Sequence, residues 1–129
     1  MHRRSLFLAA ILALGTALPA AAATQAKFTP EALAAAQTAG KPILVAFHAD
    51  WCPVCTKQKP IVNGLMQQPD FADLVILNVD YDNQKDVVKA FGVTMQSTMV
   101  AMHGKVETGR ATGITAEDAI KALMLKTKA

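Results

Sequence analysis

Short apolar runs separated by polar segments divide the chain into predicted strands and helices. Three runs, at residues 43–47, 74–80 and 98–102, are predominantly apolar. A continuous apolar run of this length between turn signals is typical of a strand buried on both faces of a sheet. A fourth strand is predicted at 106–111, after the turn at 103–105, so the last two strands should form an antiparallel hairpin.

Four helices are predicted around these strands. The first begins at Thr29-Pro30-Glu31, which supplies an N-cap, a proline at the first helical position and an acid in the first turn, and it ends at Gly40. The others are placed from residue 52 to about 68 with a kink at Pro60, over 83–91, and after the capping segment 115–118. Residues 24–27 are interpreted as a short polar leader to the domain.

The order of the elements predicts the fold class. Helices first alternate with strands, and the chain then ends with two strands followed by a helix. This order indicates an α/β domain of three layers, with a mixed central sheet flanked by helices. A chain of 129 residues allows one domain, and 52% apolar residues supply one core. We expect this domain to span residues 24–129, without repeats or linkers.

The N-terminus has the pattern of a targeting segment. The basic pair Arg3-Arg4 precedes an almost wholly apolar run at 6–18, and small residues follow at 20–23. These three features in this order predict a signal peptide. An apolar run of this length is short for a membrane span, which needs roughly 20 residues.

We therefore predict a signal peptide over residues 1–23, cleaved near Ala23, and a periplasmic or secreted mature protein. An uncleaved anchor is the alternative. The basic pair also resembles a twin-arginine signal, but no Ser or Thr precedes it, which favours ordinary secretion.

Charge gives no reason to expect a nucleic-acid partner. Without Arg3 and Arg4, the 13 basic residues fall to 11, against 10 acidic residues. A nearly neutral domain without a basic stripe lacks the electrostatic footprint of a nucleic-acid-binding protein. We expect a monomer.

The chain has only two cysteines, Cys52 and Cys55, three residues apart. A disulfide that closes so small a loop restrains the unfolded chain little, so the pair is better explained by chemistry than by stability. The spacing places Cys52 at the start of a helix and Cys55 one turn later on the same side, close enough to bridge. The helix terminus favours a thiolate on Cys52, which makes it the predicted nucleophile, and Cys55, expected to be more buried, would resolve the mixed disulfide. Pro53 between them has its φ preset for a first helical turn.

Metal binding is the other chemistry that such a pair can support. A zinc site would need a second pair of ligands, and the chain has no further cysteines. With the cysteines, a soft copper site would use Met95, Met99, Met102 and His103. However, Met99 and Met102 should face opposite sides of one strand, and such methionines usually fill core gaps.

These segments resemble the thioredoxin superfamily over nearly all of residues 30–126. The matching segments are Ala49-Asp50-Trp51-Cys52-Pro53-Val54-Cys55 at the active site, Pro60 in its helix, Asn78-Val79-Asp80 at the end of a strand, and Phe91-Gly92-Val93 before the substrate-binding loop. The lead-in to the cysteines is similar to the C-terminal periplasmic domain of the membrane thiol:disulfide interchange reductase. The resemblance implies a thiol:disulfide oxidoreductase that acts on protein or small-molecule thiols and disulfides. It implies no cofactor, and a membrane protein is a candidate electron donor.

Three departures from the family pattern bear on mechanism. Ala46 stands where the family has a buried acid that accepts the proton of the second cysteine, and Ile76 stands where it has a lysine. Val54 supplies neither charge nor hydrogen bond to the thiolate, which argues against a strong oxidant. Ser97 replaces a cis-proline before Thr98, and we predict a trans bond there because a cis bond before a non-proline residue costs roughly 3–4 kcal/mol. Loss of this proline is also associated with metal or iron–sulfur binding in the family.

Two further residues are candidates for supporting roles. His48 precedes Cys52 by four residues and would raise the thiolate population or carry a proton, or else simply pack as an aromatic-like residue. Trp51 is expected to pack beside the cysteines and shape a docking surface.

The functional prediction is an exported reductant or isomerase-like oxidoreductase. The alternatives are a metal- or iron–sulfur-binding module that uses the same cysteines, and a substrate-binding or chaperone-like domain with feeble redox activity.

Overall fold

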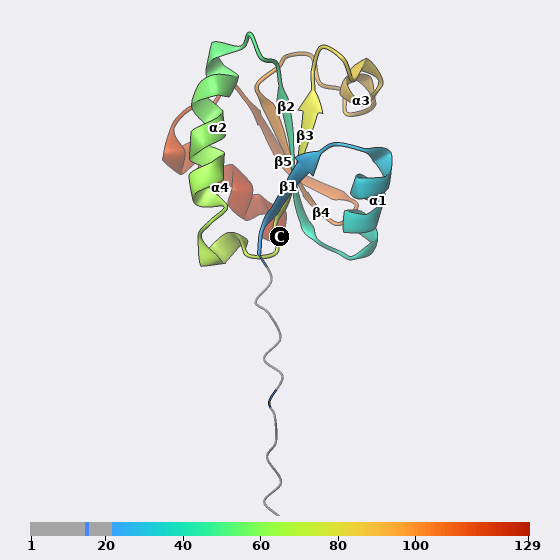
Figure 1. Cartoon of the computed structure of the whole chain (residues 1–129), viewed down its shortest axis with the longest axis vertical. Helices are drawn as coiled ribbons and strands as arrows, with labels where there is room; N and C mark the ends of the chain where they lie inside the picture. Colours follow the sequence, from blue (N-terminus) through green and yellow to red (C-terminus); the bar gives the residue numbers. More distant parts are fainter. Residues whose placement is uncertain (1–14, 16–21) are drawn as a thin grey trace, which may run out of the picture.

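The computed structural model describes residue 15 and residues 22–129 (Figure 1). The predicted leader, residues 1–23, lies outside the described residues except for Gly15, Ala22 and Ala23. Within the described part, none of the helices has the length and apolar character needed to span a bilayer.

A mixed sheet of five strands forms the middle layer, with the spatial order β1-β3-β2-β4-β5. The first three strands in this order are parallel, whereas β4 runs antiparallel to β2 and β5 runs antiparallel to β4. The predicted hairpin is thereby confirmed. The strands are β1 (Thr24–Lys27), β2 (Pro42–His48), β3 (Val75–Asp80), β4 (Thr98–His103) and β5 (Val106–Thr112).

Helices cover both faces of the sheet, with α2 and α4 on one side and α1 and α3 on the other (Figure 1). The three-layer α/β class predicted from the sequence is therefore confirmed. The helices are α1 (Pro30–Thr38), α2 (Pro53–Leu65), α3 (Lys85–Ala90) and α4 (Glu117–Leu125), with 3₁₀ turns η1 (Pro69–Phe71) and η2 (Lys126–Lys128).

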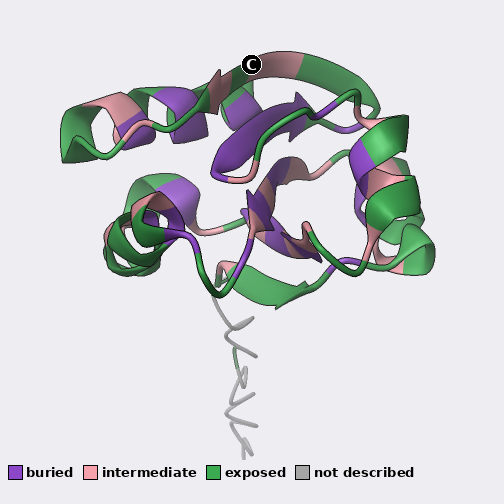
Figure 2. Ribbon diagram, turned by 90° about the horizontal axis from the view of Figure 1, so that it is seen from above, coloured by how far each residue is buried: buried purple, intermediate pink, exposed green. Residues whose placement is uncertain are grey.

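The core has two halves because the central strands are apolar on both faces. Along β2, Ile43, Val45 and Phe47 pack toward α1 and α3, whereas Leu44 packs toward α2 and α4. Buried residues accordingly gather in the central strands and on the helix sides that face them (Figure 2). This arrangement presents the end of β2 directly to the start of α2.

The interpretation of residues 24–27 as a leader was wrong, because they form strand β1. Its four residues are all exposed, so no apolar pattern marked it. The strand forms because its backbone pairs with the edge of β3, with Thr24 N–H donating to Leu74 O at 2.9 Å and Phe28 N–H donating to Asn78 O at 2.8 Å.

Three helix boundaries also differ from the predictions. Helix α2 ends at Leu65 rather than near residue 68, and a 3₁₀ turn follows it. Helix α3 begins at Lys85, because Asn83 is held in a turn by the Asp80 carboxylate. The predicted capping segment 115–118 supplies no side-chain cap, because the N-cap of α4 is Ala116.

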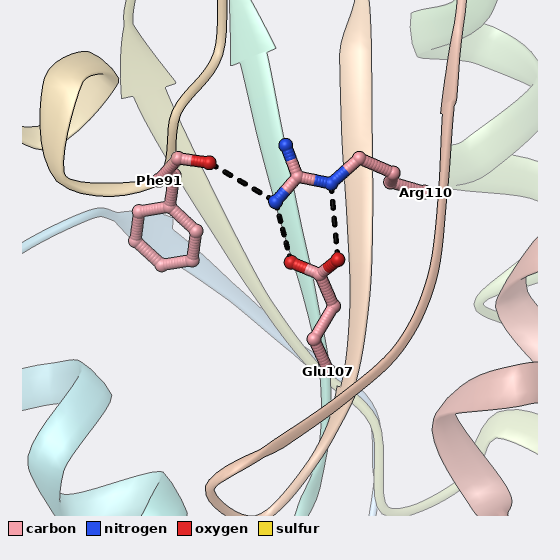
Figure 3. Close-up of polar contacts among 3 residues, drawn as sticks. All are labelled: Phe91, Glu107 and Arg110. Atoms are coloured by element: carbon pink, nitrogen blue, oxygen red, sulfur yellow. Dashed lines mark hydrogen bonds and ion pairs between the residues drawn. The ribbon is translucent and has the colours of Figure 1, made fainter.

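Arg110 on β5 ties the C-terminal end of α3 to the sheet (Figure 3). Its guanidinium donates to Phe91 O and to both carboxylate oxygens of Glu107, with 3.0 Å from Nε to Oε2. The ring of Phe91 meets Phe47 edge-on, with 5.5 Å between centroids. These contacts anchor the segment that leads to Ser97.

Candidate active site

Cys52 and Cys55 form a disulfide at the N-terminus of α2. Cys52 is the N-cap, in an extended conformation, and its Sγ accepts the backbone N–H of Cys55 at 3.1 Å. Pro53 occupies the first turn of the helix, as predicted. The sulfur of Cys52 thus takes the place that a serine or aspartate oxygen usually takes in capping a helix.

Both cysteines are buried, and the expectation that Cys55 is the more buried was wrong. Cys52 is 1% exposed and Cys55 is 7% exposed. The two cysteines and Ala49 form a small apolar cluster, with Val54 and Tyr81 packed against it.

Ser97 adopts a left-handed backbone conformation with φ of 62°, and its preceding peptide bond is trans, as predicted. Its N–H donates to Phe47 O at 2.8 Å, at the end of β2. Its carbonyl accepts from Gly113 N–H and from Gln58 Nε2, each at 3.1 Å. Hydrogen bonds to β2, α2 and the end of β5 therefore hold this loop in place of a proline.

Thr98 closes the same loop through its hydroxyl. Its Oγ1 donates to Met95 O at 2.8 Å and lies 2.8 Å from Thr112 Oγ1 on the neighbouring strand. Thr98 is buried, whereas Met95 is 53% exposed. The structure therefore places Thr98 in the support of the loop and Met95 on its surface.

Gln58 is a supporting residue that the sequence analysis missed. It is 6% exposed on α2, and its side-chain amide donates to Ser97 O and to Ile114 O at 2.9 Å. A glutamine in an amphipathic helix ordinarily faces solvent, so its type gave no signal. The only sequence signal is its place three residues after Cys55, on the same face of the helix.

Trp51 lies on the surface, 60% exposed, and its indole N–H donates to Asp82 Oδ2 at 2.7 Å. The parallel pairing of β2 with β3 brings the ends of both strands to one edge of the sheet, with His48 opposite Asp80. The turns after these strands consequently meet beside the disulfide.

Asp80 is held ionised by its surroundings. Its pKa lies below the ordinary value, chiefly because the Asn83 side chain donates to it at 2.8 Å, with smaller contributions from backbone N–H groups and from the charge of His48. His48 itself is half-buried. It shares with Cys55 the lining of two cavities, of about 310 and 30 Å³.

Ala46 is half-buried and pairs with Asn78, and Ile76 is fully buried on β3. Neither position carries an ionisable group, so the charges nearest the cysteines come from other residues.

Metal ligands do not converge in the described part of the chain. No group of three or more His, Cys, Asp or Glu side chains there is arranged to hold an ion. Met99 and Met102 belong to opposite halves of the core, which agrees with the packing interpretation of these residues.

Comparison with known proteins identifies the family. The sequence model described as thioredoxin matches residues 20–126. The chain belongs to the thioredoxin family. The chain is also similar to the crystal structure of Trxlp from Edwardsiella tarda EIB202, with a TM-score of 0.77, 34% sequence identity, and coverage of 78% of this chain and 98% of that chain.

Two curated relatives extend the comparison. A thioredoxin H-type of Brassica campestris is 35% identical over 94 residues, which cover 73% of this chain and 74% of that protein. The thiol:disulfide interchange protein TxlA of Synechococcus elongatus is 32% identical over 116 residues, which cover 86% of this chain but only 58% of TxlA. As a member of the thioredoxin family with a Cys52–Cys55 pair, the protein is a thiol:disulfide oxidoreductase that acts on protein thiols and disulfides.

Proposed function

We propose that this thioredoxin-family protein is an exported oxidoreductase in which Cys52 attacks and Cys55 resolves. The observation that supports these roles is the place of Cys52 at the N-cap of α2, where its Sγ accepts an N–H at 3.1 Å. A sulfur in this position lies beside the unpaired N–H groups and the positive end of the helix dipole. Both favour the thiolate, which is the attacking species in disulfide exchange.

The proposed reaction has two exchange steps. The Cys52 thiolate attacks one sulfur of a substrate disulfide, and the other substrate sulfur leaves as a thiolate. The Cys55 sulfur, one helical turn away, then attacks Cys52 Sγ, closes the disulfide and releases the second substrate thiol. Each turnover moves two electrons to the substrate, so a separate dithiol protein must reduce the pair again. We propose a membrane protein as this donor and a monomer as the working form.

The residues between the cysteines support a reductant or isomerase-like role. Pro53 is exposed and donates no N–H, and Val54 packs its apolar side chain against the cysteine cluster. Neither residue gives the thiolate a charge or a side-chain hydrogen bond. The thiolate is therefore stabilised mainly by the helix terminus, which favours a potential nearer that of thioredoxin, about −270 mV, than that of a strong oxidant, about −120 mV.

The surroundings of the disulfide support protein substrates. Trp51 beside the disulfide and Met95 in the Ser97 loop are large apolar side chains exposed to solvent, and the loop is hydrogen-bonded to the end of β2. We propose that Trp51, Ser97 and Thr98 shape the docking surface, with Trp51 oriented by Asp82.

The proposal that the protein is exported rests on the sequence of residues 1–23. The basic pair, apolar run and small residues there support a cleaved signal peptide and a mature domain of residues 24–129. N-terminal sequencing of protein recovered from the periplasm should find a start near Thr24. A chain that keeps its first residues after export would refute the cleavage site.

The roles of the two cysteines are separated by trapping. A reduced Cys55→Ser variant should accumulate a mixed disulfide on Cys52 with a denatured protein substrate that contains scrambled disulfides, whereas Cys52→Ser should trap little. Trapping mainly on Cys55 would reverse the roles, and exchange by neither variant nor the native protein would refute the function. Equilibration of the native pair with glutathione then gives the potential, and a value near −120 mV would overturn the proposed direction.

A further inference from the structure

Resolution by Cys55 requires a base, because its thiol is buried. Cys55 is 7% exposed and lies in an apolar cluster, and a thiol in apolar surroundings resists ionisation. Only the thiolate attacks a disulfide. Among the described residues, the N–H of Cys55 donates to Cys52 Sγ, so the helix terminus favours the charge on the first sulfur rather than on the second.

The ionisable groups that could take this proton line the cavities that reach Cys55. The larger cavity, of about 310 Å³, is lined by Cys55 together with His48, Asp50 and Lys59. The smaller one, of about 30 Å³, is lined by Cys55, His48 and Lys59 and by the amide side chains of Gln25, Gln58 and Asn78. The rest of its lining is apolar, and a cavity of this size has room for one water molecule beside these polar groups. A proton can therefore pass from Cys55 to a neighbouring group directly or through one water.

Of these groups, only an imidazole suits thiol chemistry at neutral pH. A lysine ammonium ordinarily keeps its proton there, and an exposed carboxylate is ordinarily too weak a base to take a thiol proton. A histidine ordinarily changes charge between pH 5 and 8, which is the range in which a general base works best. His48 is half-buried and lines both cavities.

Charged residues of both signs lie around His48. Asp80 faces it from β3, where the two residues are partners in the strand register and line a common opening with Lys27 of β1. Asp80 is ionised, since its pKa is lowered chiefly by the hydrogen bond from its neighbour Asn83. Lys27 and Lys59 oppose a positive charge on His48 but extend from exposed positions, and Asp50 is exposed as well.

We propose that His48 is the proton acceptor for Cys55 in the resolving step, a role that rests on the exchange mechanism proposed above. In the mixed disulfide between Cys52 and substrate, the neutral imidazole takes the proton of the Cys55 thiol. The Cys55 thiolate attacks Cys52 Sγ, the new bond joins the two cysteines, and the bond from Cys52 to the substrate sulfur breaks. The departing substrate thiolate takes a proton from the imidazolium, which restores neutral His48.

Dithiobis(nitrobenzoate), a disulfide whose released thiolate is coloured, separates the two steps. When the reduced protein is mixed with one equivalent, the first release reports attack by Cys52 and the second reports closure by Cys55. In His48→Gln, we expect the first release to be unchanged and the second to slow by about tenfold or more at pH 7, with loss of its inflection between pH 5 and 8. His48→Phe, which keeps an aromatic ring, provides a second variant should the glutamine disturb folding.

Matched variants test whether the effect belongs to His48. His103→Gln changes a histidine whose ring bonds to Thr127 O, outside the cysteine cavities, and should leave both releases unchanged. Asp80→Asn should slow the second release, because the imidazolium formed during the transfer loses the carboxylate that faces it. An unchanged second release in both folded His48 variants would overturn the proposal, as would loss of the inflection in Lys59→Gln instead. Absence of the first release in the native protein would instead refute the proposed function itself.

Discussion

The buried amide of Gln58 offers the sharpest test of how the loop at Ser97 is held. Its Nε2 donates to Ser97 O at 3.1 Å and to Ile114 O at 2.9 Å, so a single side chain joins α2 to two loops. Gln58→Met keeps a side chain of similar length and removes both donors. The variant therefore deletes the two hydrogen bonds with little change in packing volume.

The expected loss of stability depends on which hydrogen-bond donors each carbonyl oxygen retains in the variant. Ser97 O retains the N–H of Gly113 at 3.1 Å, so its loss is that of one net hydrogen bond, about 1 kcal/mol. Ile114 O keeps no other donor among the described residues, but the residue is half-buried and water reaches part of it, which also limits the loss to about 1 kcal/mol. The free energy of unfolding should fall by about 2 kcal/mol, which lowers the Tm of a domain of this size by about 10 °C.

Urea denaturation of the oxidised protein measures this difference, with the fluorescence of the single tryptophan, Trp51, as the signal. Hydrogen exchange adds a local readout, because the Ser97 and Gly113 amides should lose protection more than amides in the central strands. Gln67→Met is the control, since Gln67 is exposed and its side chain makes no hydrogen bond in the described structure.

A loss in Gln58→Met no larger than that in Gln67→Met would refute the reasoning. So would a large loss of stability with unchanged exchange at Ser97 and Gly113, because the hydrogen bonds would then not be what holds the loop.

Two further predictions concern the loop backbone and the ion pair on β5. Ser97→Gly should raise the free energy of unfolding by about 0.5–1 kcal/mol. A left-handed backbone costs a non-glycine residue roughly 1–2 kcal/mol, and the greater entropy of glycine in the unfolded chain offsets part of the relief. A glycine variant that is less stable in urea would contradict this strain argument. For Glu107, the hydrogen bonds from Arg110 hold its pKa below the ordinary value, so its stabilisation is complete above that value and is lost as the pH falls through the folded-state pKa. Both side chains are more than a third exposed, so Glu107→Gln should cost less than about 1 kcal/mol at neutral pH. The cost should shrink as the pH falls below the ordinary glutamate pKa, and a cost that stays constant in acid, measured by urea titration, would show that the pair acts through packing instead.

The strongest sequence predictions were those with an apolar pattern behind them. The strands β2, β3 and β4 were placed within two residues of their observed ends because their faces are buried, whereas the largely exposed β5 was placed by the turn that joins it to β4. Strand β1 was missed because its stability comes from backbone pairing at a sheet edge, which leaves its four side chains exposed.

The residues of the candidate site likewise fall into those that a local sequence pattern predicted and those that it did not. The cysteine pair and Pro53 were found because local spacing and backbone chemistry mark them in the chain, and Ser97 was found because the resemblance to the thioredoxin superfamily points to its position. Gln58 and Asp82 were not found, because each acts on a residue about 30 to 40 positions away in sequence. The relative burial of the two cysteines was predicted wrongly for a related reason, since it depends on what packs over the turn.

By itself, then, the order of residues determined the layers of the domain and the position of a dithiol at the start of a helix. Both follow from interactions between near neighbours and from the period of apolar side chains. Only the tertiary structure decided which groups surround that dithiol. The parallel pairing of β2 with β3 sets His48 opposite Asp80, and the packing of α2 on the sheet brings Gln58 to Ser97. Contacts of this kind depend on how distant segments meet, which no local pattern records.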